Sequence, residues 1–193
     1  MRRPRKRVQV NIFYLDEDPI QCAEQHCDKH VVKMIVEYAQ LLSTAHRVLD
    51  GVQYLDRTSN GRSIKRWRLQ DERETRVYKA THINHPSSIW TRQSDSNYRW
   101  LHNLFCALAN EYTYRYEKQH KTYSELAEVL MTPPKNIKLG DLTDPTPAMP
   151  LQYQISTQSK DCYHEYYKKG KVEIAKWTKR NTPRWFYGSD SSR

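Results

Sequence analysis

The chain has 193 residues, a formal net charge of +10 at pH 7, and 37% hydrophobic against 28% charged residues. No run of about 18 apolar residues occurs, and no apolar segment follows the basic start MRRPRKRVQV, which argues against a membrane span and a signal peptide. The four cysteines form no CxxC pair, so we expect free thiols rather than a disulfide framework in a soluble, intracellular protein.

The N-terminal part is expected to hold one long helix. Residues 8–15, VQVNIFYL, alternate like a short strand or an extended lead-in. Asp18 then suits an N-cap, with Pro19 at the first helical position. Apolar residues recur at three- to four-residue spacing from there as far as Gly51. This spacing predicts a single continuous helix.

A stretch rich in turn-forming residues follows. The sequence DGVQYLDRTSNGRS predicts a loop at 51–66, in which Asn60 and Gly61 suit a hairpin turn. A second, charged helix is expected at about 67–80, with one side in solvent.

The C-terminal half is expected to contain three further helices. One at about 95–120 matches the first in length and period, so the two should pack together. Thr122 and Glu125 form a capping box for a short helix that stops before Pro133, and a last helix is expected at about 157–169. The expected architecture is mainly α: a basic flexible arm at 1–7, a single compact helical domain at 8–188 with long irregular loops such as 132–150, and a flexible tail at 189–193.

The polar residues of the first expected helix, AEQHCDKHVVKMIVEYAQ, fall on one side. His26, His30, Lys33 and Glu37 lie at i, i+4, i+7 and i+11, so on a helix they form one stripe beside the buried apolar face. Half-burial at such a border shifts pKa values and favours proton transfer, so these four are the candidate catalytic residues. The alternative is a solvated face on which Lys33 pairs with Glu37.

A metal site is a second hypothesis for the same histidines. Histidines at i and i+4 can share a zinc or iron ion, and His82, His85 or Asp28 could supply a third ligand. The sequence HCDKH lacks the glutamate of the zinc-protease motif HExxH. We therefore expect metal-free acid–base chemistry and no cofactor.

A second polar and aromatic group surrounds Pro86, which pushes His85 out of helical geometry. The next helix begins near Ser94, where free backbone amides favour a phosphate, and nearby arginines and tryptophans supply charge and stacking surfaces. The same residues would also suit a capped helix start with aromatic residues in the core. The candidate substrate-binding residues are Gln25, His82, Asn84, His85, Ser87, Trp90, Arg92, Asn97, Arg99, Arg184 and Trp185.

The positive charge favours a polyanionic partner. Five of the positive charges lie in the first seven residues, and a net charge of +5 remains without them. Lysine and arginine gain affinity for phosphates by releasing counterions, and the 14 Tyr and 5 Trp supply rings that can stack on bases. We expect double-stranded DNA as the partner, no membrane, and a monomer.

The order of elements resembles a known family. An early helix with AEQH, a turn HPSSIW, a long helix YRWLHNLFCALANEY and an aromatic, basic end KRNTPRWFYG are similar to the pyrimidine-dimer DNA glycosylases of T-even phages, the endonuclease V family. The resemblance implies a small helical protein that grips a bent duplex, everts a nucleotide, cleaves a glycosidic bond and nicks the abasic site. It also implies that Gln25 and His26 contact DNA.

The sequence departs from that family at two points. The family attacks with an N-terminal amino group and places a glutamate about seven residues after the histidine, whereas this chain has a basic N-terminal extension and Lys33. Lys33 could itself be a Schiff-base nucleophile, with Glu37 as acid or base.

These departures leave three hypotheses about function. The first is a pyrimidine-dimer-type DNA glycosylase/lyase in the cytoplasm of an infected bacterial cell. The second is a phage DNA-hypermodifying enzyme that acts on a thymine-derived base, as the amino acid:DNA transferases do. The third is a non-enzymatic DNA-binding or host-inhibiting phage protein.

Overall fold

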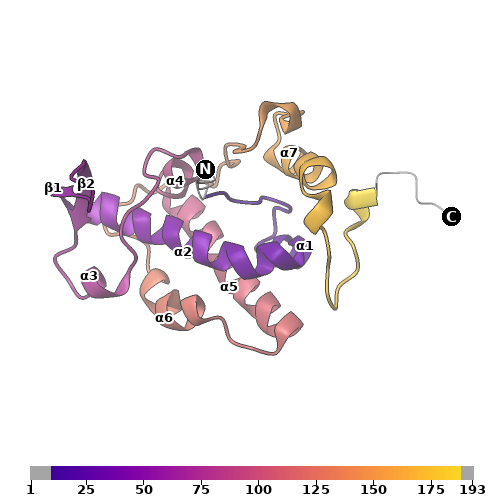
Figure 1. The fold of residues 1–193 in the computed structure, drawn as a ribbon, viewed down its shortest axis with the longest axis horizontal. Helices are drawn as coiled ribbons and strands as arrows, with labels where there is room; N and C mark the ends of the chain where they lie inside the picture. Colours follow the sequence, from indigo (N-terminus) through magenta and orange to yellow (C-terminus); the bar gives the residue numbers. More distant parts are fainter. Residues whose placement is uncertain (1–9, 188–193) are drawn as a thin grey trace.

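Residues 10–187, the part of the chain that the structure describes, form a mainly α protein in this computed structural model (Figure 1). The expected arm at 1–7 and tail at 189–193 lie outside these residues. None of the helices within residues 10–187 combines the length and the apolar character needed to cross a membrane. The elements are α1 (Pro19–Gln25), α2 (Asp28–Asp50), β1 (Val52–Arg57), β2 (Ser63–Arg68), α3 (Arg73–Arg76), α4 (Pro86–Thr91), α5 (Asp95–Tyr116), α6 (Lys121–Leu130) and α7 (Ser159–Glu165), with 3₁₀ turns at Leu151–Tyr153, Val172–Ile174 and Arg184–Tyr187 and a π turn at Tyr166–Gly170.

The core lies where α2 and α5 pack together across the middle of the molecule (Figure 1). Both helices bury an apolar stripe at helical spacing, as expected from the sequence. Helix α1 covers α5, and α6 packs against both α2 and α5. The core residues of the two long helices include Val31, Ile35, Tyr38, Leu42, Leu101, Leu104, Phe105 and Leu108.

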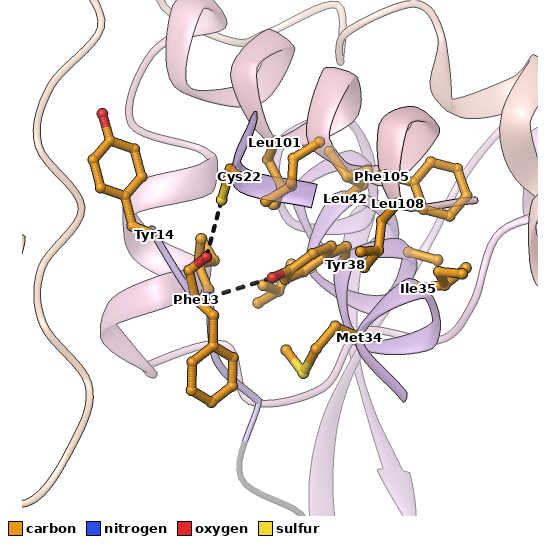
Figure 2. Packing of buried hydrophobic residues seen from close by; sticks show 14 of the residues in the cluster. Phe13, Tyr14, Cys22, Met34, Ile35, Tyr38, Leu42, Leu101, Phe105 and Leu108 are labelled. Carbon is orange, nitrogen blue, oxygen red and sulfur yellow. Dashed lines mark hydrogen bonds between the residues drawn. The ribbon is translucent and has the colours of Figure 1, made fainter. Parts of the chain in front are cut away.

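Residues 10–15 of the expected lead-in are extended and buried, and within residues 10–187 they pair with no strand. Figure 2 shows how two hydrogen bonds hold this segment: the backbone N–H of Phe13 donates to the Tyr38 hydroxyl at 3.3 Å, and the Cys22 thiol donates to the Phe13 carbonyl at 3.2 Å. These side-chain partners satisfy backbone groups that a sheet would otherwise pair. The segment thereby passes through the core beside α2.

The prediction of one continuous helix over residues 19–50 was wrong, because the helix is interrupted at His26 and Cys27. The His26 backbone is extended, with φ −64° and ψ 133°. Its ring Nδ1 lies 2.7 Å from the Cys22 carbonyl, the group that would accept the His26 N–H in a continuing helix. The imidazole thus replaces the next backbone hydrogen bond, and α2 begins two residues later at Asp28.

The expected hairpin turn at Asn60 and Gly61 is confirmed, but the region expected to be a loop at 51–66 consists mostly of the paired strands β1 and β2. The helix predicted at about 67–80 is wrong. Strand β2 runs as far as Arg68, and only the short α3 follows. The buried Arg47 guanidinium explains the difference. It donates to the carbonyls of Trp67, Glu74, Val77 and Tyr78, so this segment wraps around one side chain instead of bonding to itself.

Two boundaries in the C-terminal half also differ. Helix α5 ends before Glu117, which adopts a left-handed backbone at φ 57°, rather than continuing to residue 120. The Thr122–Glu125 capping box does not form, because α6 begins at Lys121 with His120 as its N-cap. The last predicted helix is confirmed as α7 with its π turn, which reaches Gly170.

Candidate active site

Lys33 and Glu37 form an amine–carboxylate pair on α2. Lys33 Nζ lies 2.7 Å from Glu37 Oε1, and 55% of the lysine side chain is exposed against 3% of the glutamate. The other carboxylate oxygen accepts the backbone N–H of Asn11 at 3.3 Å. The pair therefore joins an accessible amine to a buried carboxylate.

The surroundings of Glu37 favour its protonated form more than water does. Burial raises the pKa of this carboxyl group, while its contacts with Lys33 and the Asn11 N–H, and positive charge on His82, oppose that change. The effect of His82 also places this histidine within electrostatic range of Glu37. A carboxyl group with a raised pKa takes up a proton more readily than the same group in water.

The loop before α4 contains three of the candidate substrate-binding residues, His82, Asn84 and His85. His82 has a left-handed backbone at φ 50°, and its Nδ1 lies 2.8 Å from the Thr81 hydroxyl. His85 is the N-cap of α4, where its Nδ1 accepts the Ser87 N–H at 3.2 Å, as expected for a residue that Pro86 holds outside the helix. Asn84 is exposed in the same loop.

His26 does not lie on a stripe with Lys33 and Glu37, because it belongs to the break between α1 and α2. Its side chain is fully buried, and both ring nitrogens have partners: the Cys22 carbonyl, and the Tyr38 hydroxyl at 2.7 Å. Burial lowers the pKa of His26 to about 4. A neutral ring with both nitrogens engaged is suited to holding the core together.

His30 is also buried, although it lies on α2 as predicted. Its Nδ1 lies 2.5 Å from the Tyr167 hydroxyl, and its ring centroid lies 4.1 Å from that of Phe13. Burial lowers the pKa of His30 well below its usual range, and positive charge on His26, Lys171 and Lys33 acts in the same direction. His26, between α1 and α2, and His30, on α2, are thus both buried, and Lys33 is the exposed member of the four candidate residues.

The polar residues around α4 mainly hold a loop. The Trp90 indole N–H donates to the Thr143 carbonyl at 3.1 Å, and the Asn97 side chain bonds to both Trp90 and Thr143. Arg92 donates to the Ser88 hydroxyl and to the Ile83 carbonyl. Ser87 is 2% exposed. These contacts match the alternative considered for this segment, a capped helix start with a buried aromatic ring.

Gln25 and Trp185 meet where the C-terminal segment docks on α1. The Trp185 indole N–H donates to Gln25 Oε1 at 2.7 Å, and the Trp185 ring stacks on His164 with centroids 4.0 Å apart. Arg184 is exposed beside them. Arg99 is 60% exposed on α5, with its Nε 3.6 Å from Asp95. Within residues 10–187, no hydrogen bond or ion pair joins any of these residues to Lys33 or Glu37.

Asn11 is the site residue that sequence reasoning missed. Its backbone N–H reaches Glu37, its side-chain oxygen accepts the Tyr163 hydroxyl at 2.6 Å, and its amide donates to the Ala148 carbonyl at 2.8 Å. The one available signal was a polar residue inside the apolar segment VQVNIFYL. The side chain therefore fixes the backbone that bonds the carboxylate.

Within residues 10–187, no three His, Cys, Asp or Glu side chains are grouped so that they could hold a metal ion. No family model, no curated protein and no solved structure matches the chain.

Proposed function

We propose that the protein is a DNA-acting enzyme that removes a pyrimidine-type base, with Lys33 as the attacking amine and Glu37 as its proton acceptor and donor. The observation that supports this most strongly is the contact between an accessible amine and a buried carboxylate at 2.7 Å. An ammonium group must lose a proton before it can attack, and Glu37 provides an acceptor whose pKa burial raises. The pair thus offers the attacking amine and the proton acceptor and donor that amine-based glycosylase/lyase chemistry needs.

The proposed reaction begins with transfer of a proton from Lys33 to Glu37. The neutral Nζ attacks C1′ of an everted nucleotide, the bond between C1′ and the base breaks, and the base leaves with the bonding electrons and takes the proton from Glu37. The nitrogen then returns one proton to Glu37. Its lone pair expels O4′, which takes up that proton, and a protonated Schiff base remains. Glu37, which is then a carboxylate again, takes the proton from C2′, and the electrons of that C–H bond expel the 3′ phosphate, which nicks the strand.

Two further features support a DNA substrate. The net charge of +10 favours phosphate binding at neutral pH. His82 and Asn84 are exposed in the loop near the pair, where they can offer hydrogen bonds to the edges of an everted base. The substrate class remains part of the proposal.

Borohydride trapping tests the proposal, because it reduces a Schiff base to a stable amine that links protein and DNA. The probes are duplexes that contain a thymine dimer or an abasic site. We expect the wild-type protein and Lys29→Ala to give an adduct, and Lys33→Ala to give none. Lys29 is a matched control because it is an exposed lysine one turn earlier on α2.

Lys33→Ala should fold normally, because the side chain is half-exposed. An adduct that persists in Lys33→Ala, or its absence from the wild-type protein, contradicts the proposal. Absence of an adduct with intact DNA binding would instead favour the transferase or the non-enzymatic DNA-binding hypothesis.

A further inference from the structure

The β1–β2 hairpin has a cationic face that no part of the proposed reaction uses. The hairpin extends from the end of α2, at the opposite end of the molecule from α1 (Figure 1). Residues 52–68 hold five Lys or Arg side chains and a single carboxylate, Asp56. The strands are antiparallel, and Leu55 pairs with Lys65. Because side chains alternate along each strand, the hairpin has two distinct faces.

On one face, both arginines contact other residues of the hairpin. Arg66 Nε lies 3.6 Å from Asp56, and the Arg68 guanidinium lies over the Tyr54 ring at 5.1 Å. These contacts engage both arginines of that face within the hairpin. This face therefore carries a formal net charge of +1, from two arginines and Asp56, against +2 on the other face.

The other face, the basic hairpin face, has cations without counter-ions. Arg57 and Lys65 form no ion pair with any residue between 10 and 187, and this face contains no acidic residue. Every residue on it except Trp67 is exposed. The basic hairpin face consists of Gln53, Leu55, Arg57, Ser63, Lys65 and Trp67.

The base of the hairpin is held firmly. Arg47 Nη1 donates to the Trp67 carbonyl at 3.1 Å from inside the core. Gly51 is packed so closely that an added Cβ would lie 2.5 Å from the Arg47 carbonyl and 3.1 Å from the Trp67 Cβ. A cationic ribbon that is already ordered loses less entropy on binding than a mobile one.

We infer that the basic hairpin face binds duplex DNA, with Arg57 and Lys65 on the phosphates. A two-stranded ribbon fits the major groove of B-DNA, and free cations opposite phosphates release counterions. The inference rests on the DNA partner of the proposed function but not on the chemistry at Lys33. Its failure would leave adduct formation at saturating protein unchanged.

The test measures the dissociation constant for an undamaged duplex of about 20 base pairs at about 50 and 200 mM salt. The variant is Arg57→Gln/Lys65→Gln. The matched control, Lys118→Gln/Lys121→Gln, removes the same charge from exposed positions where α6 begins. Losing two phosphate contacts lowers the salt slope by about 1.8, so the ratio of the two dissociation constants should fall by about twelvefold.

The control should keep a salt slope closer to that of the wild-type protein. Equal changes in both double variants overturn the inference, because they would reflect net charge alone. It is also overturned if the hairpin variant keeps its affinity for DNA and loses affinity only for vesicles of anionic phospholipid. Circular dichroism of both variants checks that the exposed substitutions leave the fold intact.

Discussion

Glu37 lies where α2 passes from solvent to core, and this position gives the carboxylate its proposed role. Its neighbour Lys33 is exposed, while its other contact is a backbone N–H donated by the buried Asn11. A carboxylate in bulk water would remain ionised at neutral pH. Burial raises the pKa of Glu37, which makes proton exchange with the amine easier.

Glu37→Gln should therefore slow the trapping reaction while DNA binding stays unchanged. Glutamine keeps the size of the side chain but cannot accept the ammonium proton, and such loss of acid–base catalysis costs roughly 10²- to 10⁴-fold in rate. Single-turnover trapping measures this rate. The control is Glu128→Gln, a glutamate that is 79% exposed on α6. A rate for Glu37→Gln equal to that of the control would remove Glu37 from the mechanism.

His26 should affect the pH dependence of stability rather than catalysis. Burial lowers its pKa from 6.5 to about 4 in the folded protein. Above pH 6.5 the ring is mostly neutral in both states, whereas between about 6.5 and 4 the unfolded chain binds a proton that the folded protein does not. Stability therefore decreases as the pH falls through this window.

Urea unfolding at several pH values measures this effect. His26→Gln should reduce the slope of the unfolding free energy between pH 6.5 and 4 by about 1.4 kcal/mol per pH unit. The same variant should still form the borohydride adduct, even if its stability is lower overall. An unchanged slope combined with loss of the adduct would assign His26 to catalysis instead.

At the scale of elements, Arg47 organises the segment between β2 and α4. Its guanidinium donates to four carbonyls and to Glu74 Oε2, and the residue is 4% exposed. Arg47→Met should destabilise the protein by about 3–5 kcal/mol, because it leaves these acceptors buried without their donor. The unfolding midpoint in urea measures the loss.

Arg76→Met is the control for this prediction. Arg76 pairs with Glu128 at the surface, and exposed ion pairs contribute about 1 kcal/mol or less. A loss for Arg47→Met as small as that of the control would contradict the role given to Arg47. Its hydrogen bond to the Trp67 carbonyl also makes the Arg47 side chain a support for the hairpin.

Helices with a continuous apolar stripe could be predicted from the sequence, whereas segments organised by one distant side chain could not. The spacing of apolar residues identified most of α2 and α5, because burial of one face determines them. Hydrogen bonds from the Arg47 side chain determine the path of the segment after Arg68, and Arg47 lies 27 or more residues earlier in the chain than the carbonyls it contacts there. The break at His26 depends on a ring nitrogen that replaces a backbone donor. Neither effect leaves a periodic pattern.

For the candidate site too, helical spacing identified some residues, whereas residues placed by distant contacts could not be predicted. Lys33 and Glu37 were found because a spacing of four residues on a helix brings them together. The spacing misplaced His26, since it assumed a continuous helix. Asn11 reaches Glu37 across 26 residues of sequence, and only the path of the extended segment through the core brings them together.

At the scale of the whole molecule, a partly buried charge network joins the helix break to the C-terminal segment. Arg115 on α5 donates to Glu111 and Asp28, and Arg180 donates to the same Glu111. Asp28 also accepts the N–H of Thr178. These bonds to Asp28 fix the start of α2, and they thereby help to hold Lys33, which lies just over one turn further along the helix, in place.

Much of helix α2 separates the proposed active site from the basic hairpin face, which begins just beyond its end. Lys33 and Gly51 are separated by 18 residues of sequence along and just beyond α2, a rise of about 27 Å. This distance corresponds to about eight base pairs of B-DNA. A duplex that contacts both regions must therefore extend well beyond the nucleotide that reacts.

The central claim is that Lys33 is the attacking amine, and peptide mapping of the reduced adduct tests it most directly. Trypsin does not cleave after a modified lysine, so an adduct on Lys33 would leave residues 30–47, HVVKMIVEYAQLLSTAHR, as one modified peptide. We predict that mass spectrometry finds the sugar remnant in this peptide, on Lys33. A remnant on any other lysine, with residues 30–33 released unmodified, would contradict the account.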